Sequence, residues 1–578
     1  MLAGYLREIY HRDPPEVSEY HGEWGSLAVS QNLYIGFQPY ETEAQLFVII
    51  GGPVLNFCSN RFLTGDDPLG GTLPVFERFQ NGDIRWDEDL SGPFAILIVD
   101  KLEKTIQCIT DLMLFIPVYE FVSDRFTALG THVDALAKTA GRQSEIDKVS
   151  LVDFVLHKLI TYPYTAYTGI WQCCPAANHT YYPFSGPSSK PEPKRYWTPV
   201  EQNSFDTIDE AAEELRKAVT EEIERVTESM VHVAQFISGG EDSRTIAGLM
   251  PDHLKKDGFI FLDNMNREGR IARKVSGVYG LNFTVKLREP THYLKILPEA
   301  SDMIGSGRQF THAHTLGFHK ECKLTEYDAV FGGFLANSLL KADEARKTDK
   351  RKRYPFLPDK LVEGEEHSRP VENKLFTSPV LREIDKRRHS FIKMLSEYRK
   401  DSLHEWFQFW PRSMGYACPN VDVNRRLFRS YEPFLCNKVI KISASVPTTW
   451  KLNRRIYAKA FRESHKPAKW IPHANGYLPF FPWWFNVPLL FFFWFRKKIK
   501  NRLGLSGKVH EGPWFDWNAL VKTDEWKTLV KECEKDFIKD FFEGHLSEKR
   551  SDRLSNELKH SRIINLIQIR YQFYTKNQ

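Results

Sequence analysis

Short apolar segments recur between residues 27 and 135, separated by turn-forming residues such as GDDPLGG and QNGD. Runs of this length and spacing predict β-strands packed as a sandwich. FAILIVD and TIQCIT, joined by KLEK, predict a hairpin over residues 94–110. The predicted strands are LAV, LYIGF, LFVII, FAILIVD, TIQCIT, IPVYEFV and RFTAL.

The hydrophobic period changes after the polar, proline-rich stretch SGPSSKPEPKRYW, which is typical of a linker. DEAAEELRKAVTEEIERVTESM places apolar residues every three or four positions, which predicts an amphipathic helix capped by Asp206 or Asp209. Strand-like and helical runs then alternate, and helices follow to the end. This alternation predicts a parallel sheet with helices on both faces and ligands at the carboxyl ends of its strands. The runs are VHVAQFI, RTIAGLM, FIFLD, EGRIARKVSGVYG, FTVKL and DAVFGG.

Composition adds little to this α/β prediction. The 578 residues, 42% hydrophobic and 26% charged, predict an ordinary globular protein of several domains. A net charge of +5 does not indicate a nucleic-acid partner. The eight cysteines have no CxxC pair and no zinc-ligand spacing, which predicts reduced, mostly buried thiols. Together with an N-terminus that lacks a signal-peptide core, this predicts a cytoplasmic protein.

Two segments raise the question of a surface partner. Leu489–Phe495 (LLFFFWF) is followed by the basic run Arg496–Arg502 and is too short to cross a bilayer. Residues 483–502 are therefore either an interfacial membrane helix, with aromatic anchors and a basic flank, or a buried or partner-facing helix. A second basic run, Arg346–Arg353, is typical of a solvated loop, with an RNA-binding patch as the alternative.

The strongest chemical signal is FISGGEDSRT, residues 236–245, which joins a predicted strand to a predicted helix. Two glycines let the backbone approach an anion, and the helix N-terminus attracts negative charge. Two serines add hydroxyl donors, and an aspartate suits Mg²⁺ held against phosphates. The motif predicts a site for ATP and Mg²⁺, with an ordinary strand–turn–helix connection as the alternative. The candidate ligands are Ser238, Gly239, Gly240, Asp242 and Ser243.

This loop resembles the SGGxDS pyrophosphate loop of the asparagine synthetase family. LSGPFAILIVD, DLMLFIPVYEF, THVDAL, GIWQCCPAA and YEPFLCNKVIKISASVPTTWKLNRRIYAKAF resemble other passages of the family, so the similarity covers about residues 1–475. It implies an N-terminal Ntn-hydrolase-like αββα sandwich, the glutaminase-like domain, over residues 1–200. It also implies a pyrophosphate-loop α/β synthetase domain with a helical C-terminal part over residues 205–578. A homodimer is a further expectation.

The resemblance also implies an activity. Enzymes of this family adenylate a carboxylate with ATP, release pyrophosphate, and let an amine displace AMP to form an amide. The matching position for a lysine that stabilises this charge is Lys451, with a solvated lysine in a basic helix as the alternative. Leu262 and Asp263 fall at an adenosine-contacting turn or an ordinary strand end. Gly332 and Gly333 are further nucleotide-binding candidates, and Asp242 and Asn337 are the candidate Mg²⁺ ligands.

The N-terminal half departs from the family at its nucleophile. The family exposes a cysteine as its first residue, whereas this chain begins Met1, Leu2, Ala3, Gly4. Gly51 and Gly52 stand where the family has an Asn-Gly turn. Because covalent catalysis needs a nucleophile, we expect no glutaminase activity.

The synthetase half departs from the family after DAVFGG. Phe334 and Asn337 stand where the family has acidic residues, including a second Mg²⁺ ligand. An amide oxygen is a weaker ligand than a carboxylate, and Glu241 is the residue that could replace the missing charge. These changes keep a catalytically degenerate member among the alternatives.

Several other polar residues are candidates of lower specificity. Glu268 is interpreted as a helix-capping acid, and Glu432 as a structural residue of the YEPFL passage. A substrate pocket lined by histidines is the remaining hypothesis, although His312 and His314 cannot share a helical face. Its residues are Arg308, His312, His314 and His319.

Three functional hypotheses follow. The first is an ATP-dependent ligase that joins a small-molecule, peptide or sugar carboxylate to an amine other than ammonia, as in β-lactam synthetases and macrolactam cyclases. Amidation with ammonia from another source is its variant. The second is a pyrophosphate-loop enzyme acting on tRNA, which lacks support because no cysteine pair suits sulfur transfer. The third is a non-catalytic member retained for partner or membrane binding.

Overall fold

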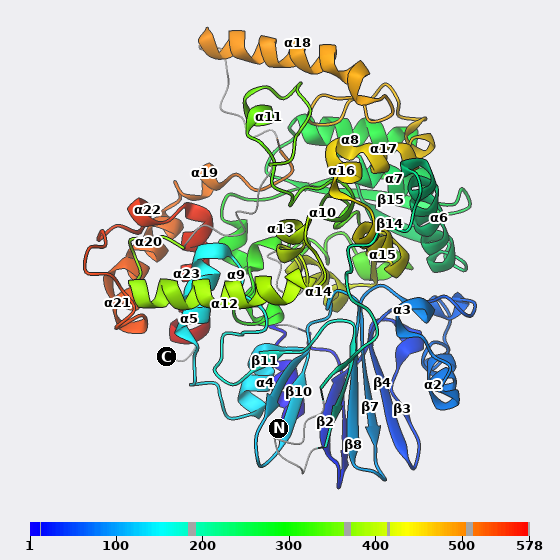
Figure 1. Ribbon diagram of the computed structural model, residues 1–578, viewed down its shortest axis with the longest axis vertical. Helices are drawn as coiled ribbons and strands as arrows, with labels where there is room; N and C mark the ends of the chain where they lie inside the picture. The colour runs from blue at the N-terminus through cyan, green and yellow to red at the C-terminus, as the bar shows by residue number, and fades with distance from the viewer. Residues whose placement is uncertain (12, 183–191, 363–370, 413–416, 504–511, 576–578) are drawn as a thin grey trace.

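The computed structural model describes all residues except 12, 183–191, 363–370, 413–416, 504–511 and 576–578. The predicted linker therefore lies partly outside the described residues. The chain is a mixed α/β structure with strand-rich N-terminal layers, a central parallel sheet and a helical C-terminal region, as predicted (Figure 1).

The N-terminal strands form two stacked sheets. The larger is antiparallel, with the order β13-β12-β8-β7-β4-β3, and contains the predicted hairpin over residues 94–110. The smaller has the order β10-β9-β11. The strands are β3 (Tyr40–Glu41), β4 (Gln45–Gly51), β7 (Phe94–Asp100), β8 (Thr105–Thr110), β9 (Tyr119–Val122), β10 (Thr127–Gly130), β11 (Trp171–Gln172), β12 (Ala177–Tyr181) and β13 (Lys194–Arg195).

Alternating side chains explain how these sheets pack. Along β7, Ala95 and Leu97 face the smaller sheet, while Ile96 and Ile98 face α2 (Thr72–Asn81) and α3 (Trp86–Asp89). Helices α4 (Val133–Thr139) and α5 (Lys148–His157) pack beyond the smaller sheet. The order of layers is that of the predicted sandwich, and its kinship with the Ntn hydrolases stays a prediction.

One predicted strand is wrong. LYIGF contains a short 3₁₀ turn, η1 (Ile35–Phe37), instead of a strand. The amide of Asn32 donates to the carbonyl oxygens of Ile49 and Gly51, at 3.2 and 2.8 Å, and so fixes this segment across the end of β4. Its apolar residues Tyr34 and Phe37 are buried by this crossing instead of by strand pairing.

The central sheet has five parallel strands in the order β16-β15-β14-β17-β18. Because β15 lies on one side of β14 and β17 on the other, the connections after β14 and β17 diverge, and a ligand-binding crevice is expected there. The predicted alternation is confirmed by β14 (His232–Phe236), α7 (Asp242–Leu249), β15 (Lys255–Leu262), α8 (Arg267–Val278), β16 (Asn282–Leu287) and β17 (Ala329–Phe331), and β18 (Ser430–Tyr431) forms the edge.

Helix α6 (Ile208–Val226) covers this sheet through its apolar stripe. Its cap is Thr207, whose hydroxyl accepts from the amide of Glu210, so the prediction of Asp206 or Asp209 is wrong. Thr207 has the extended backbone that an N-cap requires, whereas Asp209 already lies in the first turn.

The C-terminal region is helical, as predicted. Helices α20 to α23 pack against α5 and α9, while α18 projects from the body (Figure 1). Within the described residues, none of the helices combines the length and apolarity that crossing a membrane requires. The main helices are α9 (His292–Ile304), α12 (Ser378–Ser396), α14 (Pro419–Leu427), α15 (Asn437–Ser445), α17 (Arg455–Ala460), α18 (Trp483–Arg502), α20 (Asp524–Glu532), α21 (Ile538–Phe541), α22 (Leu554–Glu557) and α23 (His560–Arg570).

Candidate active site

The glycine loop lies between the end of β14 and the start of α7, at the carboxyl edge of the central sheet. The end of β17 lies beside it. A Cβ atom at Gly333 would stand 3.0 Å from the Cβ of Asp242, so glycine favours this close approach. The structure therefore brings Gly333 to the predicted phosphate loop, at the point where the sheet connections diverge.

Three amides of the loop are hydrogen-bonded to side chains. Ser238 N–H donates to the hydroxyl of Ser243, and Gly240 N–H donates to the hydroxyl of Ser238, both at 3.1 Å. Gly239 N–H donates to Oε1 of Glu268 at 2.7 Å. The Glu268 carboxylate thus accepts from the amide of Gly239, at the corner of the glycine loop. A phosphate oxygen makes the same kind of contact.

Glu268 lies in the first turn of α8, where a negative charge complements the helix dipole as interpreted. Asn266 is the N-cap of α8, and its side chain accepts from the amide of Gly269. Glu268 is 3% exposed, and burial raises the pKa of its carboxyl, although the Gly239 amide lowers it. Because Asn266 caps the helix end, the buried carboxylate of Glu268 can reach across the crevice to the Gly239 amide.

Two acidic and two basic side chains meet at the C-terminal side of the loop. Lys341 Nζ lies 2.8 Å from Oε1 of Glu241 and also bonds Asp242. Arg454 Nε donates to Glu241 at 2.6 Å. Burial favours the neutral form of Glu241, but Arg454 and Lys341 hold its pKa below the usual value. The cluster is electrically balanced and almost closed to solvent, since Glu241 is 2% exposed and Lys341 8%.

Aromatic rings hold the two cations in place. Lys341 Nζ stands 4.2 Å from the ring centre of Tyr457, and the Arg454 guanidinium stands 4.5 Å from that of Tyr477. The Tyr457 hydroxyl lies 2.7 Å from that of Thr245 on α7. Cation–π contacts in a buried site add to the ion pairs, so both charges are fixed beside the loop.

Residues 471–474 cover the glycine corner. The buried Arg244 guanidinium donates to the carbonyl oxygens of Ile471 and Pro472, both at 2.7 Å, and to that of Gly239 at 3.1 Å. The Ala474 amide donates to the same Gly239 oxygen at 3.1 Å. This segment covers the buried Gly239 and would have to shift for a ligand to enter from its side.

Lys451, the predicted catalytic lysine, lies in a different cluster. Its ammonium is fully buried 2.9 Å from Oε1 of Glu405 and near the Trp406 ring. Burial lowers its pKa, while Glu405 opposes the shift. The chain turns at Asn453 and Arg454, which have φ of 56° and 64°, so Arg454 reaches the loop and Lys451 does not.

Other nucleotide-binding candidates have backbone or ion-pair partners. Leu262 is fully buried, and its carbonyl oxygen accepts from the Arg288 amide at 2.7 Å. Asp263 accepts from Nε of Arg288 at 2.8 Å and from the amide of Asp516 at 2.6 Å. Both residues therefore help to fix the end of β15.

The acceptors around Asp242 do not make a protein-bound Mg²⁺ site of the predicted kind. Its carboxylate already bonds the Lys341 ammonium. Asn337, the second predicted ligand, is exposed on α10 (Ala336–Leu340). Mg²⁺ is typically held by one or two carboxylates together with phosphates and waters, and here the carboxylate of Asp242 bonds an ammonium.

The proposed histidine pocket is separate from the loop. Arg308 forms a buried ion pair with Asp422. Burial lowers the pKa of His312 to about 3, and that of His314 falls well below its usual value. The two rings are partly buried, pack on each other and lie near Trp514. The substrate role of the four predicted residues stays a prediction.

A cavity lies where the N-terminal sheets meet the central sheet. It is lined on one side by Gly51 and Gly52 and on the other by Glu222, Arg425 and Glu432. Burial raises the pKa of Glu432 to about 8 and that of Glu222 to about 7. The carboxyl of Glu432 also accepts from the amide of Phe334, at 2.8 Å, and so supports the turn after β17.

The fold defines a mixed α/β protein with a glycine loop at the carboxyl edge of a parallel sheet. The chain is 23% identical over 308 residues to "Asparagine synthetase [glutamine-hydrolyzing] 1" of Bacillus subtilis (strain 168). The match covers 50% of this chain and 47% of that relative, so the chain spans about half the length of the curated protein it matches. No family model matches the chain. The similarity supports distant homology to the asparagine synthetases and nothing more specific.

Proposed function

We propose that the chain is an ATP-dependent ligase that activates a carboxylate by adenylation and passes it to an amine. The observation that carries this proposal is the pair of cations, Lys341 and Arg454, fixed beside a glycine loop at the diverging edge of a parallel sheet. Distant similarity to an asparagine synthetase supports the same chemistry. Pyrophosphate and AMP are the expected products.

The loop would bind the ATP phosphates, with Gly239 and Gly240 supplying amides and Ser238 and Ser243 supplying hydroxyls. Lys341 and Arg454 would stabilise the charge that grows on the departing pyrophosphate. In this proposal the Glu268 carboxylate gives up the Gly239 amide to a phosphate oxygen. Gly332, Gly333 and the end of β15 at Leu262 would border the nucleotide.

The cations replace much of the role that the family gives to protein-bound metal. Since Asp242 already bonds Lys341, we derive no step from a Mg²⁺ ion held by Asp242 and Asn337. Magnesium would enter as the counter-ion of ATP, ligated by phosphates and water.

The N-terminal half, residues 1–200, is proposed as a domain without glutaminase activity, beside a synthetase domain of residues 205–578. Leu2–Arg7 forms helix α1, which contains no cysteine, serine or threonine that could replace the family's N-terminal cysteine. The amine would therefore come from the substrate itself or from a second molecule, on a small-molecule, peptide or sugar scaffold.

A test is the exchange of labelled pyrophosphate into ATP over a panel of carboxylic acids. We expect exchange with at least one acid, and about a hundredfold loss in Lys341→Met, since removing one charge-stabilising donor typically costs two to three orders of magnitude. Lys323→Met, at a lysine that is 69% exposed, is the matched control. Equal exchange in both variants would refute the assignment.

A catalytically silent nucleotide binder is the second candidate. Phe334 follows β17, Asn337 lies on α10, and Lys341 bonds the single loop aspartate. This alternative would be established if the protein binds ATP, loses that binding in loop variants, and catalyses no pyrophosphate exchange with any acid.

A further inference from the structure

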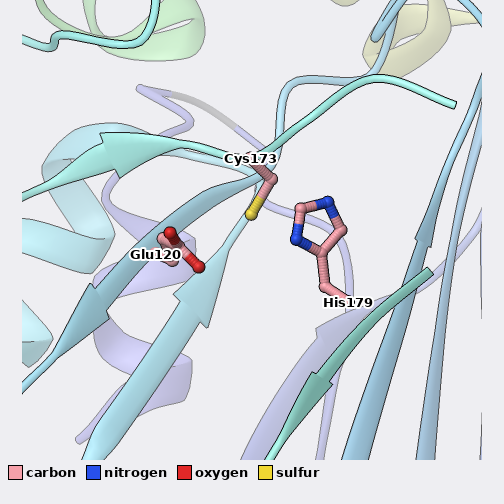
Figure 2. Close-up of side chains that lie close together, drawn as sticks. All are labelled: Glu120, Cys173 and His179. Carbon is pink, nitrogen blue, oxygen red and sulfur yellow. The ribbon is translucent and has the colours of Figure 1, made fainter. Parts of the chain in front are cut away.

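Three potential metal ligands converge inside the N-terminal sandwich (Figure 2). Glu120 lies on β9, Cys173 follows β11, and His179 lies on β12. Their donor atoms all lie within 4.8 Å of one another, and all three residues are buried. We propose that they bind a Zn²⁺ ion, which would join the smaller sheet to the larger one. The proposed metal site is separate from the glycine loop, and the proposal does not depend on ligase activity.

The orientation of the imidazole fits this role. Nε2 of His179 lies 3.0 Å from the carbonyl oxygen of Cys174, and since a carbonyl only accepts, Nε2 carries the proton. The lone pair is then on Nδ1. Figure 2 shows the ring nitrogen next to the side-chain attachment turned toward the sulfur of Cys173 and the carboxylate of Glu120. Metal-binding histidines typically donate their second nitrogen to a carbonyl in this way.

A tyrosine orients the carboxylate. The Tyr181 hydroxyl donates to Oε2 of Glu120 at 2.6 Å and lies 3.6 Å from the sulfur of Cys173. The phenol thus serves as a hydrogen-bond donor to the proposed metal-binding carboxylate.

Charge and donor softness select the ion. Thiolate, imidazole and carboxylate are the donors that zinc prefers, and a water molecule would complete a tetrahedron. On binding, the Cys173 thiol releases its proton and its sulfur bonds the metal. The two negative ligands then balance the divalent ion, so the buried site carries no net charge. Glu120 and His179 lie on different strands and Cys173 follows a third, so the sequence shows no familiar zinc-ligand spacing.

The test uses the full-length protein, saturated with Zn²⁺, dialysed, and analysed for bound metal by plasma mass spectrometry. We expect about one ion per chain, and at least a tenfold weaker affinity in Cys173→Ser and Glu120→Gln, as for loss of a ligand. Cys322→Ser, at another buried thiol, is the matched control. Cobalt substitution should give a thiolate-to-metal absorption band that Cys173→Ser abolishes.

Glu120→Gln keeps an acceptor for Tyr181, so it separates lost metal binding from lost folding. Zinc should raise the melting temperature of the wild type and of Cys322→Ser, but not that of Glu120→Gln. The proposal is overturned if the wild type retains no metal, or if Cys173→Ser retains as much as Cys322→Ser. In either case the cluster is a hydrogen-bonded core feature.

An independent observation concerns α18, which projects from the body (Figure 1). Large apolar side chains cover it on several sides, and Trp484 is 74% and Phe492 58% exposed. We propose that α18 attaches the protein to the surface of a membrane that contains anionic lipids. The exposed aromatic and aliphatic residues are Trp484, Phe485, Phe491, Phe492, Phe493, Phe495 and Ile499.

Positive charge accompanies this apolar surface. The cations of the segment Arg496–Arg502 are exposed on the last turns of α18. The second basic run meets the same helix, because Trp494 Nε1 donates to the carbonyl oxygen of Arg353 at 3.2 Å and Arg351 stands 4.9 Å from the Trp483 ring. Aromatic residues beside clustered cations are typical of helices that lie at the surface of anionic bilayers.

The test is co-sedimentation with vesicles of phosphatidylcholine, with and without phosphatidylglycerol. We expect binding to the anionic vesicles, at least about tenfold weaker binding in Lys497→Glu/Lys498→Glu, and a similar loss in Trp484→Ala/Phe492→Ala. Trp171→Ala, at a tryptophan 40% exposed on β11, is the control. Equal sedimentation with neutral vesicles, or a concentration-dependent dimer abolished by the α18 variants, would overturn the proposal.

Discussion

The Gly239 amide donates to the carboxylate of Glu268 at 2.7 Å, across the crevice between β14 and α8. A protein anion thus makes the contact that the first amide of a phosphate loop makes with its ligand. Ligand binding at this corner requires Glu268 to move or to become neutral. The affinity of the loop for phosphate should therefore depend on Glu268, which lies 29 positions from Gly239 in the sequence.

Replacing Glu268 with glutamine should strengthen ATP binding. The amide oxygen of Glu268→Gln can still accept from Gly239, but it does not repel phosphate, so we expect a several-fold lower Kd in calorimetric titration. Glu289→Gln, at a glutamate 65% exposed, is the control and should leave Kd unchanged. A weaker affinity in Glu268→Gln would show that the carboxylate supports the bound state.

Lys341 should contribute to stability as well as to binding. Lys341→Met leaves Asp242 and part of the charge of Glu241 buried without their partner, so we expect a loss of about 3 kcal/mol in the free energy of unfolding. Urea denaturation measures it. Lys341→Met/Asp242→Asn removes one charge of each sign and should recover part of that loss. No recovery would mean that the two residues are not coupled.

Lys451 is expected to be structural. Lys451→Met leaves Glu405 as a buried unpaired carboxylate, and the free energy of unfolding should fall by about 3–5 kcal/mol. The Kd for ATP, measured below the unfolding temperature, should not change. A Lys451→Met protein that folds normally but loses pyrophosphate exchange would restore Lys451 as the catalytic lysine.

The raised pKa of Glu432, about 8, predicts a pH dependence of folding. Between the usual pKa of 4.5 and about 8, the unfolded chain holds fewer protons at this residue than the folded chain. Stability from this group is therefore complete at acidic pH and is lost as the pH rises, by at most about 1.4 kcal/mol per pH unit. Glu432→Gln should flatten the curve of unfolding free energy between pH 5 and 8. An unchanged slope would contradict the buried, protonated state.

Local sequence patterns predicted much of the fold because strands and helices are determined largely by residues that are close together in the sequence. The strands and helices from His232 to Phe331 follow hydrophobic periodicity, and the glycine loop is one contiguous motif. LYIGF was misinterpreted because apolar alternation cannot show that Asn32 ties the segment across β4.

The missed site residues depend on distant contacts. Lys341 meets Asp242 from 99 residues away, and Arg454 meets Glu241 from 213 residues away. The signal near Arg454 was the basic run that contains Lys451, but the backbone turn at Asn453, φ 56°, decides which cation reaches the loop. No periodic pattern encodes that turn.

The most direct test of the central claim is calorimetric titration of the wild type and Arg454→Gln with ATP and magnesium. Saturable binding by the wild type with one site per chain, weakened about tenfold or more in Arg454→Gln, is the predicted result. No measurable binding by the wild type, or identical binding by the two proteins, would contradict a nucleotide site at the β14–α7 loop.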